Sequence, residues 1–522
     1  MAQKPSPISQ NNLDQTTTNS TLSKLTQASD STRSSIFPAI NADGTKTVFN
    51  SDSDLLNQGI PDNQNEIWLY DSNTASLQRI TTASDNGRDS MQPSISGDGT
   101  KIAFSSNSDF LNQGLSHVEV WLYDTTNQSF TRVTNSSDPT RNSSRPHISS
   151  DGNWIVFESD GDFLNQGIPD EQTEVWLYNV QTSGLMRLTT ASAADRSSVQ
   201  PRVNADGSKV VFAGDSDFLG QGVPFDQPEV WLLDIGSMNL TRITTASESG
   251  RVSYAPDIDD SGTNIVFQSN SDFLNEGIVS GQMEVWRYET GLGKLFRVTT
   301  ASPALIPIGD STAPRISGNG RFIIFESAND FTGQNRMGTI EIWSFDIATN
   351  STQRLSIAPD GSTGFSHTPD INETGSSVAF YSSVDFTNHT TQSLPNEVWL
   401  YQSSTSQTPE LLMNYNTGAP GSYFSVTGQN FPANSTAAIS VNGRSLGTTS
   451  VDANGRFFFV LTTDSANEGT YFVTATVNPS ATQQFILDAA AAVHPQENSG
   501  DTFDTPAGIA FTEFIYLPVV IR

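Results

Sequence analysis

The sequence contains no cysteine, which excludes disulfide bonds, thiolate nucleophiles and metal sites built on thiolates. It also lacks long apolar runs: no stretch approaches the ~18 apolar residues that a membrane-spanning helix needs. We therefore expect a chain that does not span a membrane. The first 21 residues have no apolar segment of the signal-peptide kind, so no export signal is visible in this chain. The absence of cysteine leaves the compartment open.

Basic residues are scarce as well. The chain has 26 Lys and Arg against 56 Asp and Glu, which gives a formal net charge of −30. Such a chain repels phosphate backbones, so we expect no nucleic acid partner. The charge itself has two interpretations that stay open, namely solubility and the collection of cations.

An internal repeat dominates the 522 residues. A Glu–Val/Ile–Trp motif gives the tryptophans Trp68, Trp121, Trp176, Trp231, Trp286, Trp343 and Trp399. A proline recurs in step with it, at Pro38, Pro93, Pro146, Pro201, Pro256, Pro314 and Pro369. Seven units of about 55 residues therefore fill positions 33 to 405.

Each unit contains four strand-like runs, which in the second unit are "QPSIS" (92–96), "KIAFSS" (101–106), "EVWLYD" (119–124) and "SFTRVT" (129–134). Tight-turn signals separate the first from the second and the third from the fourth. Four antiparallel strands per unit predict an all-β fold, a seven-bladed β-propeller. An extra copy of the fourth-strand signature, "KLTQAS" (24–29), precedes the first unit. We expect it to supply the outer strand of blade seven and so to close the ring.

The run "RITTAS…QPSISGDGTKIAFSSNSDF…EVWLYD" (79–124) resembles the repeat of TolB-type bacterial propellers, also called PD40-like repeats. It is also similar to a secreted bacterial variant of that repeat. The resemblance covers about residues 24–405 and implies the fold. It does not imply a function, because propellers bind, scaffold and catalyse.

The period stops after the propeller. Residues 421–478 alternate apolar and polar side chains between Gly and Asn turns, which is typical of an immunoglobulin-like β-sandwich. The predicted domains are a disordered segment 1–20, a propeller 21–407, an Ig-like sandwich 408–488, and a linker with a short apolar tail 489–522. The one G-x-S-x-G match, at 443–447, lies between strand-like runs and predicts a hairpin, not a catalytic elbow.

The loops of a blade divide between two faces. The turn after the first strand and the hairpin after the third lie on one face and are short. The loop after the second strand and the link to the next blade lie on the other face and are long, as in "SNSDFLNQGLSHV". Long loops on one face are where function usually lies, so this long-loop face, with the channel mouth, is the predicted site.

The long links carry a recurring arginine, at Arg33, Arg88, Arg141, Arg196 and Arg251. Two interpretations of these arginines remain open. They could hold an anion such as a carboxylate or phosphate near the channel mouth. Alternatively, each pairs with an acidic loop residue of its own or the adjacent blade.

Acidic residues also recur in every unit. The Asp of the loop "SDFLNQG" (108–114) is expected to cap its turn through backbone N–H groups, while Phe and Leu hold the loop to the blade. Loops in units one and three also place oxygen ligands at alternate positions, a pattern that suits Ca²⁺. The candidate calcium ligands are Asp62, Gln64, Glu66, Asp170, Gln172 and Glu174.

No motif identifies catalytic residues, and the five histidines have no metal-ligand spacing. The sequence favours an exported, non-enzymatic propeller, expected to be monomeric, that binds a protein or glycan through the long-loop face. We expect it to be secreted, periplasmic or on the cell surface. The alternatives are a glycan hydrolase or lyase using channel-mouth carboxylates, and a structural component of the cell envelope.

Blades six and seven break the repeat. They lack the repeated Arg and carry degraded loops, "NDFTGQN" (329–335) and "VDFTNHT" (384–390), which marks them as the first place to look for a functional site.

Overall fold

The protein is described by a computed structural model. It describes residues 20–507 except 29, 84, 86, 116, 194, 247, 279–280, 301–308, 332–338, 358–363, 387–394, 404–408, 433–434, 453–454, 478–479 and 497–500. The chain divides into two units, the first comprising Ser20–Ser403 and the second lying after it. The predicted disordered segment and the apolar end of the chain fall outside the described residues. Within the described part, no helix is long and apolar enough to cross a membrane.

The first unit consists of seven four-stranded antiparallel sheets, so the predicted all-β fold with seven blades is confirmed. The innermost strands are β2 (Ser35–Ile40), β6 (Ser90–Ile95), β10 (Ser143–Ile148), β14 (Ser198–Val203), β18 (Ser253–Ile258), β22 (Ser311–Ile316) and β26 (Ser366–Ile371). The second strands are β3 (Lys46–Ser51), β7 (Lys101–Ser106), β11 (Trp154–Ser159), β15 (Lys209–Gly214), β19 (Asn264–Ser269), β23 (Phe322–Ser327) and β27 (Ser377–Ser382).

The two outer positions complete each blade. The third strands are β4 (Glu66–Asp71), β8 (Glu119–Asp124), β12 (Glu174–Asn179), β16 (Glu229–Asp234), β20 (Glu284–Glu289), β24 (Glu341–Asp346) and β28 (Glu397–Ser403). The fourth strands are β5 (Ser76–Arg79), β9 (Ser129–Arg132), β13 (Gly184–Arg187), β17 (Asn239–Arg242), β21 (Lys294–Arg297), β25 (Ser351–Arg354) and, for blade seven, β1 (Ser20–Lys24).

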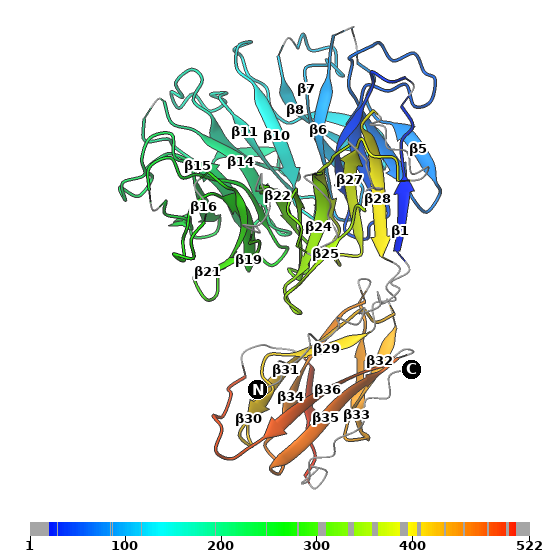
Figure 1. Cartoon of the computed structure of the whole chain (residues 1–522), viewed down its shortest axis with the longest axis vertical. Helices are drawn as coiled ribbons and strands as arrows, with labels where there is room; N and C mark the ends of the chain where they lie inside the picture. The colour runs from blue at the N-terminus through cyan, green and yellow to red at the C-terminus, as the bar shows by residue number, and fades with distance from the viewer. Residues whose placement is uncertain are drawn as a thin grey trace, which may run out of the picture. The chain divides into compact units, whose positions relative to one another are not determined.

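The N-terminal strand closes the ring, as predicted. β1 pairs with β28 in antiparallel register, and Lys24 lies opposite Trp399 just as Arg79 lies opposite Trp68 in blade one. Figure 1 shows β1 beside β28, although β1 is the first strand of the propeller in the sequence and β28 is the last. The strand ends at Lys24, so only the first residue of the predicted segment 24–29 belongs to it.

The hydrophobic core of the propeller lies between neighbouring blades. The cluster around Phe104 and Trp121 of blade two includes Val48 and Ile67 of blade one. The cluster around Phe49 and Trp68 likewise joins blade one to blade seven. The seven repeat tryptophans are fully buried. Each blade therefore depends on its neighbours for its core, as in other repeat architectures.

Backbone hydrogen bonds join the seven turns that follow the innermost strands into a ring. The amide of Ala42 donates to Gly97 O (3.1 Å), and the series continues from blade to blade until Glu373 N donates to Ala42 O (3.1 Å). We call these turns the turn ring. It borders the central channel at the end opposite the long-loop face.

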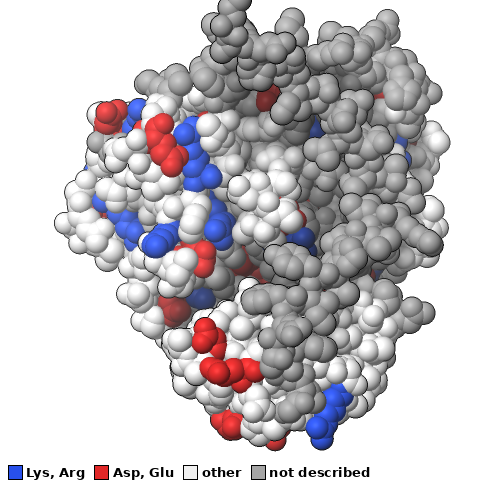
Figure 2. Space-filling view, turned by 60° about the horizontal axis from the view of Figure 1, so that its bottom comes forward, with Lys and Arg blue, Asp and Glu red and all other residues white. Residues whose placement is uncertain are grey.

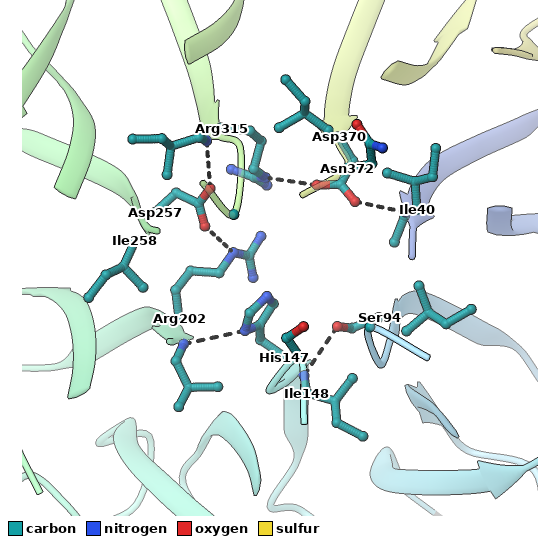
Figure 3. Close-up of a pocket in the computed structure, with 18 of the residues that line it drawn as sticks. Ile40, Ser94, His147, Ile148, Arg202, Asp257, Ile258, Arg315, Asp370 and Asn372 are labelled. Carbon is teal, nitrogen blue, oxygen red and sulfur yellow. Dashed lines mark hydrogen bonds and ion pairs between the residues drawn. The ribbon is translucent and has the colours of Figure 1, made fainter. Parts of the chain in front are cut away.

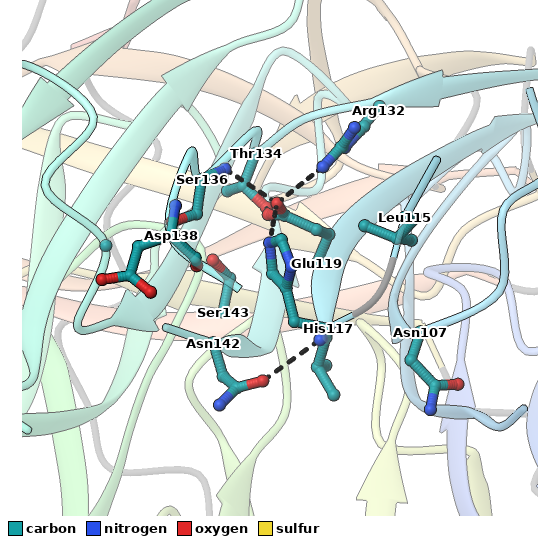
Figure 4. Close-up of polar contacts among 12 residues, drawn as sticks. Asn107, Leu115, His117, Glu119, Arg132, Thr134, Ser136, Asp138, Asn142 and Ser143 are labelled. Carbon is teal, nitrogen blue, oxygen red and sulfur yellow. Dashed lines mark hydrogen bonds and ion pairs between the residues drawn. The ribbon is translucent and has the colours of Figure 1, made fainter. Parts of the chain in front are cut away.

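The Glu of the Glu–Val/Ile–Trp motif links the third and fourth strands of its blade. In blade two, Glu119 accepts hydrogen bonds from Arg132 (2.9 Å), from Ser136 N (2.8 Å) and from the Thr134 hydroxyl (Figure 4). His117 adds a contact of 2.7 Å from its Nε2. In blade seven, Lys24 takes the place of the arginine at 3.2 Å from Glu397. The recurrence of this glutamate is therefore explained by the fold of the blade.

The recurring loop behaves partly as predicted. Asp109 accepts the N–H groups of Gln113 (2.8 Å) and Gly114 (2.7 Å). Burial acts to raise the pKa of Asp109, but these amide donors lower it on balance. Phe110 packs edge-on against Trp121, with ring centroids 5.0 Å apart. The expected role of the Leu is wrong: Leu111 is 41% exposed, because the Phe occupies the packing position against the blade.

Blade four departs from a hydrogen-bonded serine pair found in the other six blades. In blade three, Ser159 Oγ lies 3.0 Å from Ser143 Oγ and also bonds Asn142 O and Gly161 N. Blade four has Gly214 at that position, and Ser198 Oγ is buried there without a hydrogen-bond partner among the described residues.

Replacing Gly214 with Ser should restore this pair. We expect Gly214→Ser to raise the free energy of unfolding by about 1 kcal/mol, through the satisfied hydroxyl and the lower entropy of the unfolded chain. An added Cβ would lie 3.2 Å from Ser197 O, a close fit at a place where six blades hold Ser. Denaturant titration measures the effect, and Ser159→Gly should lower stability comparably. A destabilised Gly214→Ser variant would contradict this explanation.

The second unit is a β-sandwich. One sheet has the order β29 (Glu410–Met413), β31 (Tyr423–Gln429), β34 (Phe457–Thr462) and β37 (Asp501–Asp504). The other has the order β30 (Thr417–Gly418), β36 (Ala481–Leu487), β35 (Gly469–Thr476), β32 (Thr436–Val441) and β33 (Arg444–Ser450). Both sheets contribute to one core. The G-x-S-x-G match begins the second strand of the β32–β33 hairpin, as predicted, and β37 lies within the predicted linker.

Candidate functional site: the central channel

The innermost strands surround a cavity of about 400 Å³ on the propeller axis. Each of these strands carries a register shift next to its repeat proline. The residue after each proline forms what we call the post-proline ring, which consists of Ala39, Ser94, His147, Arg202, Asp257, Arg315 and Asp370. Figure 3 shows its polar members reaching toward the centre of the channel from successive blades. Blades three to seven contribute ionisable side chains, whereas blades one and two contribute Ala39 and Ser94.

Four members of the post-proline ring accept a backbone N–H from the next blade. Asp370 accepts Ile40 N (2.8 Å) and Asp257 accepts Ile316 N (2.9 Å) (Figure 3). Ser94 Oγ accepts Ile148 N at 3.1 Å, and His147 Nδ1 accepts Val203 N at 3.3 Å. These contacts hold the side chains in place across the blade boundaries. The bond to Ile40 joins blade seven to blade one.

Two ion pairs lie in the ring. Arg202 Nε is 3.6 Å from Asp257 Oδ1, and Arg315 Nε is 4.0 Å from Asp370 Oδ1. Burial raises the pKa of both aspartates, while the nearby arginines act in the opposite direction. Burial and the charge of Arg315 lower the pKa of Arg202 to about 10, so its guanidinium stays charged at neutral pH. Burial, with the two arginine charges, lowers the pKa of His147 well below its usual value.

The residues just before the prolines lie nearer the long-loop face, because each innermost strand begins there. They include Phe37, which is 39% exposed, and Arg145, whose side chain is 46% exposed. Arg145 is 3.3 Å from Glu158, and Glu158 also accepts Gln200 N at 2.7 Å. The backbone at Phe37 and Arg145 has positive φ, 52° and 49°, which the bulge imposes. The channel mouth is therefore built from strained backbone, a feature common at functional sites.

The five arginines predicted as an anion site lie one to a blade, and each bonds within its own blade. Arg33 donates to Asp52 O (2.6 Å) and Ile60 O (3.0 Å) and pairs with Asp62. Arg88 donates to Asn107 O (2.6 Å). Arg141 donates to Ile168 O (3.0 Å) and Asp170 (2.5 Å). In the same way, Arg196 donates to Asp215 O and Val223 O, and Arg251 to Asn270 O. Anion binding by these arginines stays a prediction.

The predicted calcium ligands take part in hydrogen bonds of the blades. Gln64 Nε2 donates to Glu66 (3.1 Å), and Glu66 also accepts Arg79 and Ala83 N. In blade three, Gln172 donates to Glu174 at 2.6 Å, and Asp170 pairs with Arg141. Within the described residues, no group of three or more His, Cys, Asp or Glu side chains could hold a metal ion. Calcium binding stays a prediction.

The post-proline ring is a candidate site that sequence reasoning missed, although the repeat proline was recognised. Aligning the seven units on that proline and reading the next residue would have found it. The degraded loops of blades six and seven lie largely outside the described residues. These two blades nevertheless contribute Arg315 and Asp370 to the ring.

Over part of the face shown in Figure 2, Lys and Arg side chains lie next to Asp and Glu side chains. The net charge of −30 thus coexists with local mixed patches, and the channel repeats that mixture in its buried ion pairs.

No protein-family profile and no curated protein matches the chain. Among solved structures, an oligogalacturonate lyase from Vibrio parahaemolyticus is similar with a TM-score of 0.50 and 12% identity, covering 74% of this chain and 94% of that one. An oligogalacturonate lyase in complex with manganese has a TM-score of 0.48 and 12% identity, and the match covers 75% of this chain and 95% of that one. A protein of Agrobacterium tumefaciens described as TolB has a TM-score of 0.33 and 18% identity, and the match covers 50% of this chain and 79% of that one.

At these identities the comparisons concern the fold alone. Together with the seven blades they define this chain as a β-propeller protein with a polar central channel. The seven four-stranded sheets confirm the propeller fold that the repeat predicts.

Proposed function

We propose that this chain is an exported, non-enzymatic binding protein whose propeller takes part of a glycan into the central channel from the long-loop face. The observation that carries the proposal is the post-proline ring, where ionisable side chains from five blades converge on a cavity of about 400 Å³. A cavity with a few converging polar groups is the usual form of a ligand site. Its size suits a sugar unit or one protruding side chain of a protein ligand. Export rests on the resemblance of the repeat to secreted bacterial propellers.

A glycan array probed with the full chain tests this function. The wild-type chain should retain a subset of glycans. Ala39→Trp puts a large side chain at the smallest position of the post-proline ring and should weaken their retention by about tenfold or more, because the loss of one contact with a bound glycan has an effect of that size. Ala490→Trp is the matched control, because Ala490 is exposed in the sandwich unit. Retention of no glycan, or equal retention by the Ala39→Trp variant, would reject the proposal.

A hydrolase or lyase is the second candidate, because Asp257 and Asp370 are channel carboxylates whose pKa is raised by burial. Their bonds to Ile316 N and Ile40 N favour the binding function, since both carboxylates already hold the next blade. Incubating each retained glycan with the chain and analysing the products separates the two candidates. Cleavage that Asp257→Asn abolishes would establish the enzyme.

A further inference from the structure

Several hydrogen-bond donors of the post-proline ring have no acceptor among the described residues. One acceptor atom each of Ser94, His147, Asp257 and Asp370 receives a backbone N–H. The other carboxylate oxygen of each aspartate lies 3.6 or 4.0 Å from an arginine Nε. Arg202, by contrast, contacts Asp257 only through Nε, and its two Nη groups have no acceptor among the described residues. Arg315 donates one Nη1 bond, to Pro314 O at 2.9 Å, which leaves Nη2 for the channel.

His147 adds a further donor. Val203 N donates to its Nδ1, so the proton of the neutral ring is on Nε2. The ring is neutral because burial and the arginine charges disfavour its protonation. Nε2–H is therefore available in the channel beside Arg202 (Figure 3).

Next to Ala39, the small member of the post-proline ring, the backbone supplies a further hydrogen-bond donor. The amides of Ile40, Ile148, Val203 and Ile316 meet an acceptor from the preceding blade. The equivalent amide of Ile95 follows Ala39, whose methyl group accepts nothing. The space at Ala39 thus adjoins an amide donor.

The two guanidinium groups also repel each other: burial and the charge of Arg315 lower the pKa of Arg202, although the charges of Asp257 and Asp370 act to raise it. An anion between them would relieve that repulsion. Acidic residues limit how deep an anion can enter the channel. Asp260 and Glu373 both lie against Gly318 in the turn ring, at the end of the channel opposite the long-loop face. An anion entering from the long-loop face is therefore favoured at the arginines and repelled beyond them.

From these donors, we infer that Arg202, Arg315 and His147 form a carboxylate subsite, so that the glycan taken into the channel is an acidic one. This inference rests on the proposed function and names its ligand class. Charge-assisted, forked hydrogen bonds from arginine suit the two oxygens of a carboxylate.

Calorimetric titration of the full chain with D-glucuronate and with D-glucose tests the inference, since the two sugars differ at one carboxylate. Glucuronate should bind at least about tenfold more tightly. Arg202→Gln and Arg315→Gln should each remove most of that preference. Arg444→Gln, which changes an exposed arginine of the sandwich unit, should leave it intact. Circular dichroism shows whether each variant is folded. If Arg202→Gln does not fold, Arg202→Lys replaces it; this variant keeps the positive charge but loses the forked donor group, so we expect an intermediate preference for glucuronate.

Equal binding of the two sugars, or binding of neither, overturns the inference. Inorganic phosphate that binds as tightly as glucuronate also overturns the assignment to a carboxylate. The array distinguishes this failure from failure of the proposed function. If the wild-type chain retains neutral glycans and the Ala39→Trp variant does not, the channel binds glycans but has no carboxylate subsite. An array that retains nothing would remove both.

Discussion

Replacing Glu229 with Ala should lower the free energy of unfolding by about 3–5 kcal/mol, the range found when a buried ion pair loses one partner. Glu229 is fully buried and accepts Arg242 (2.9 Å), Ala246 N (2.7 Å) and the Thr244 hydroxyl. Without it, these donors lose their acceptor, and the Arg242 charge stays in a site where its side chain is 7% exposed. Denaturant unfolding followed by tryptophan fluorescence measures the loss.

The link between this blade and the next provides the control. Glu248 is 69% exposed and pairs with Arg251 at 3.3 Å, so Glu248→Ala should cost no more than about 1 kcal/mol. If both variants unfold at the same denaturant concentration, the third and fourth strands do not depend on the buried glutamate, and our explanation of its recurrence fails.

Removing β1 should destabilise the propeller still more. A chain starting at residue 30 loses the outer strand of blade seven, the burial of Leu25, and the Lys24, Thr26 and Ala28 contacts of Glu397. The buried carboxylate and the apolar side chain together imply a loss of about 5 kcal/mol or more. The exposed edge of β28 should also promote aggregation.

A chain starting at Ser20, which keeps β1, is the matched comparison. Thermal unfolding and light scattering of the two chains measure stability and aggregation. Equal melting temperatures would contradict closure of the ring by the N-terminal strand.

The repeat made most of the propeller predictable. The tryptophan, proline and turn signals recur in each unit, so β7 and β8 begin and end where the sequence predicts. The closing strand could be located because Lys24 occupies the place of Arg79 against the repeat tryptophan. The strand itself runs before that residue, since Thr26 and Ala28 turn back to Glu397.

The candidate site was less predictable for a physical reason. The post-proline residues differ from blade to blade, so a search for recurring residues passes over them. Their importance arises only when seven innermost strands meet around one axis and bring Arg202 near Asp257. The calcium prediction stays open for a related reason. Alternate oxygen ligands such as Gln64 and Glu66 look the same in sequence whether they bind a cation or, as in the structure, each other.

The most direct test of the central claim is a crystal structure of the full chain with the glycan that the array retains most strongly. We expect density for the glycan in the central channel, with an acidic group within hydrogen-bond distance of Arg202 and Arg315. Glycan bound on the sandwich unit or outside the blades, with the channel holding only water, would contradict it.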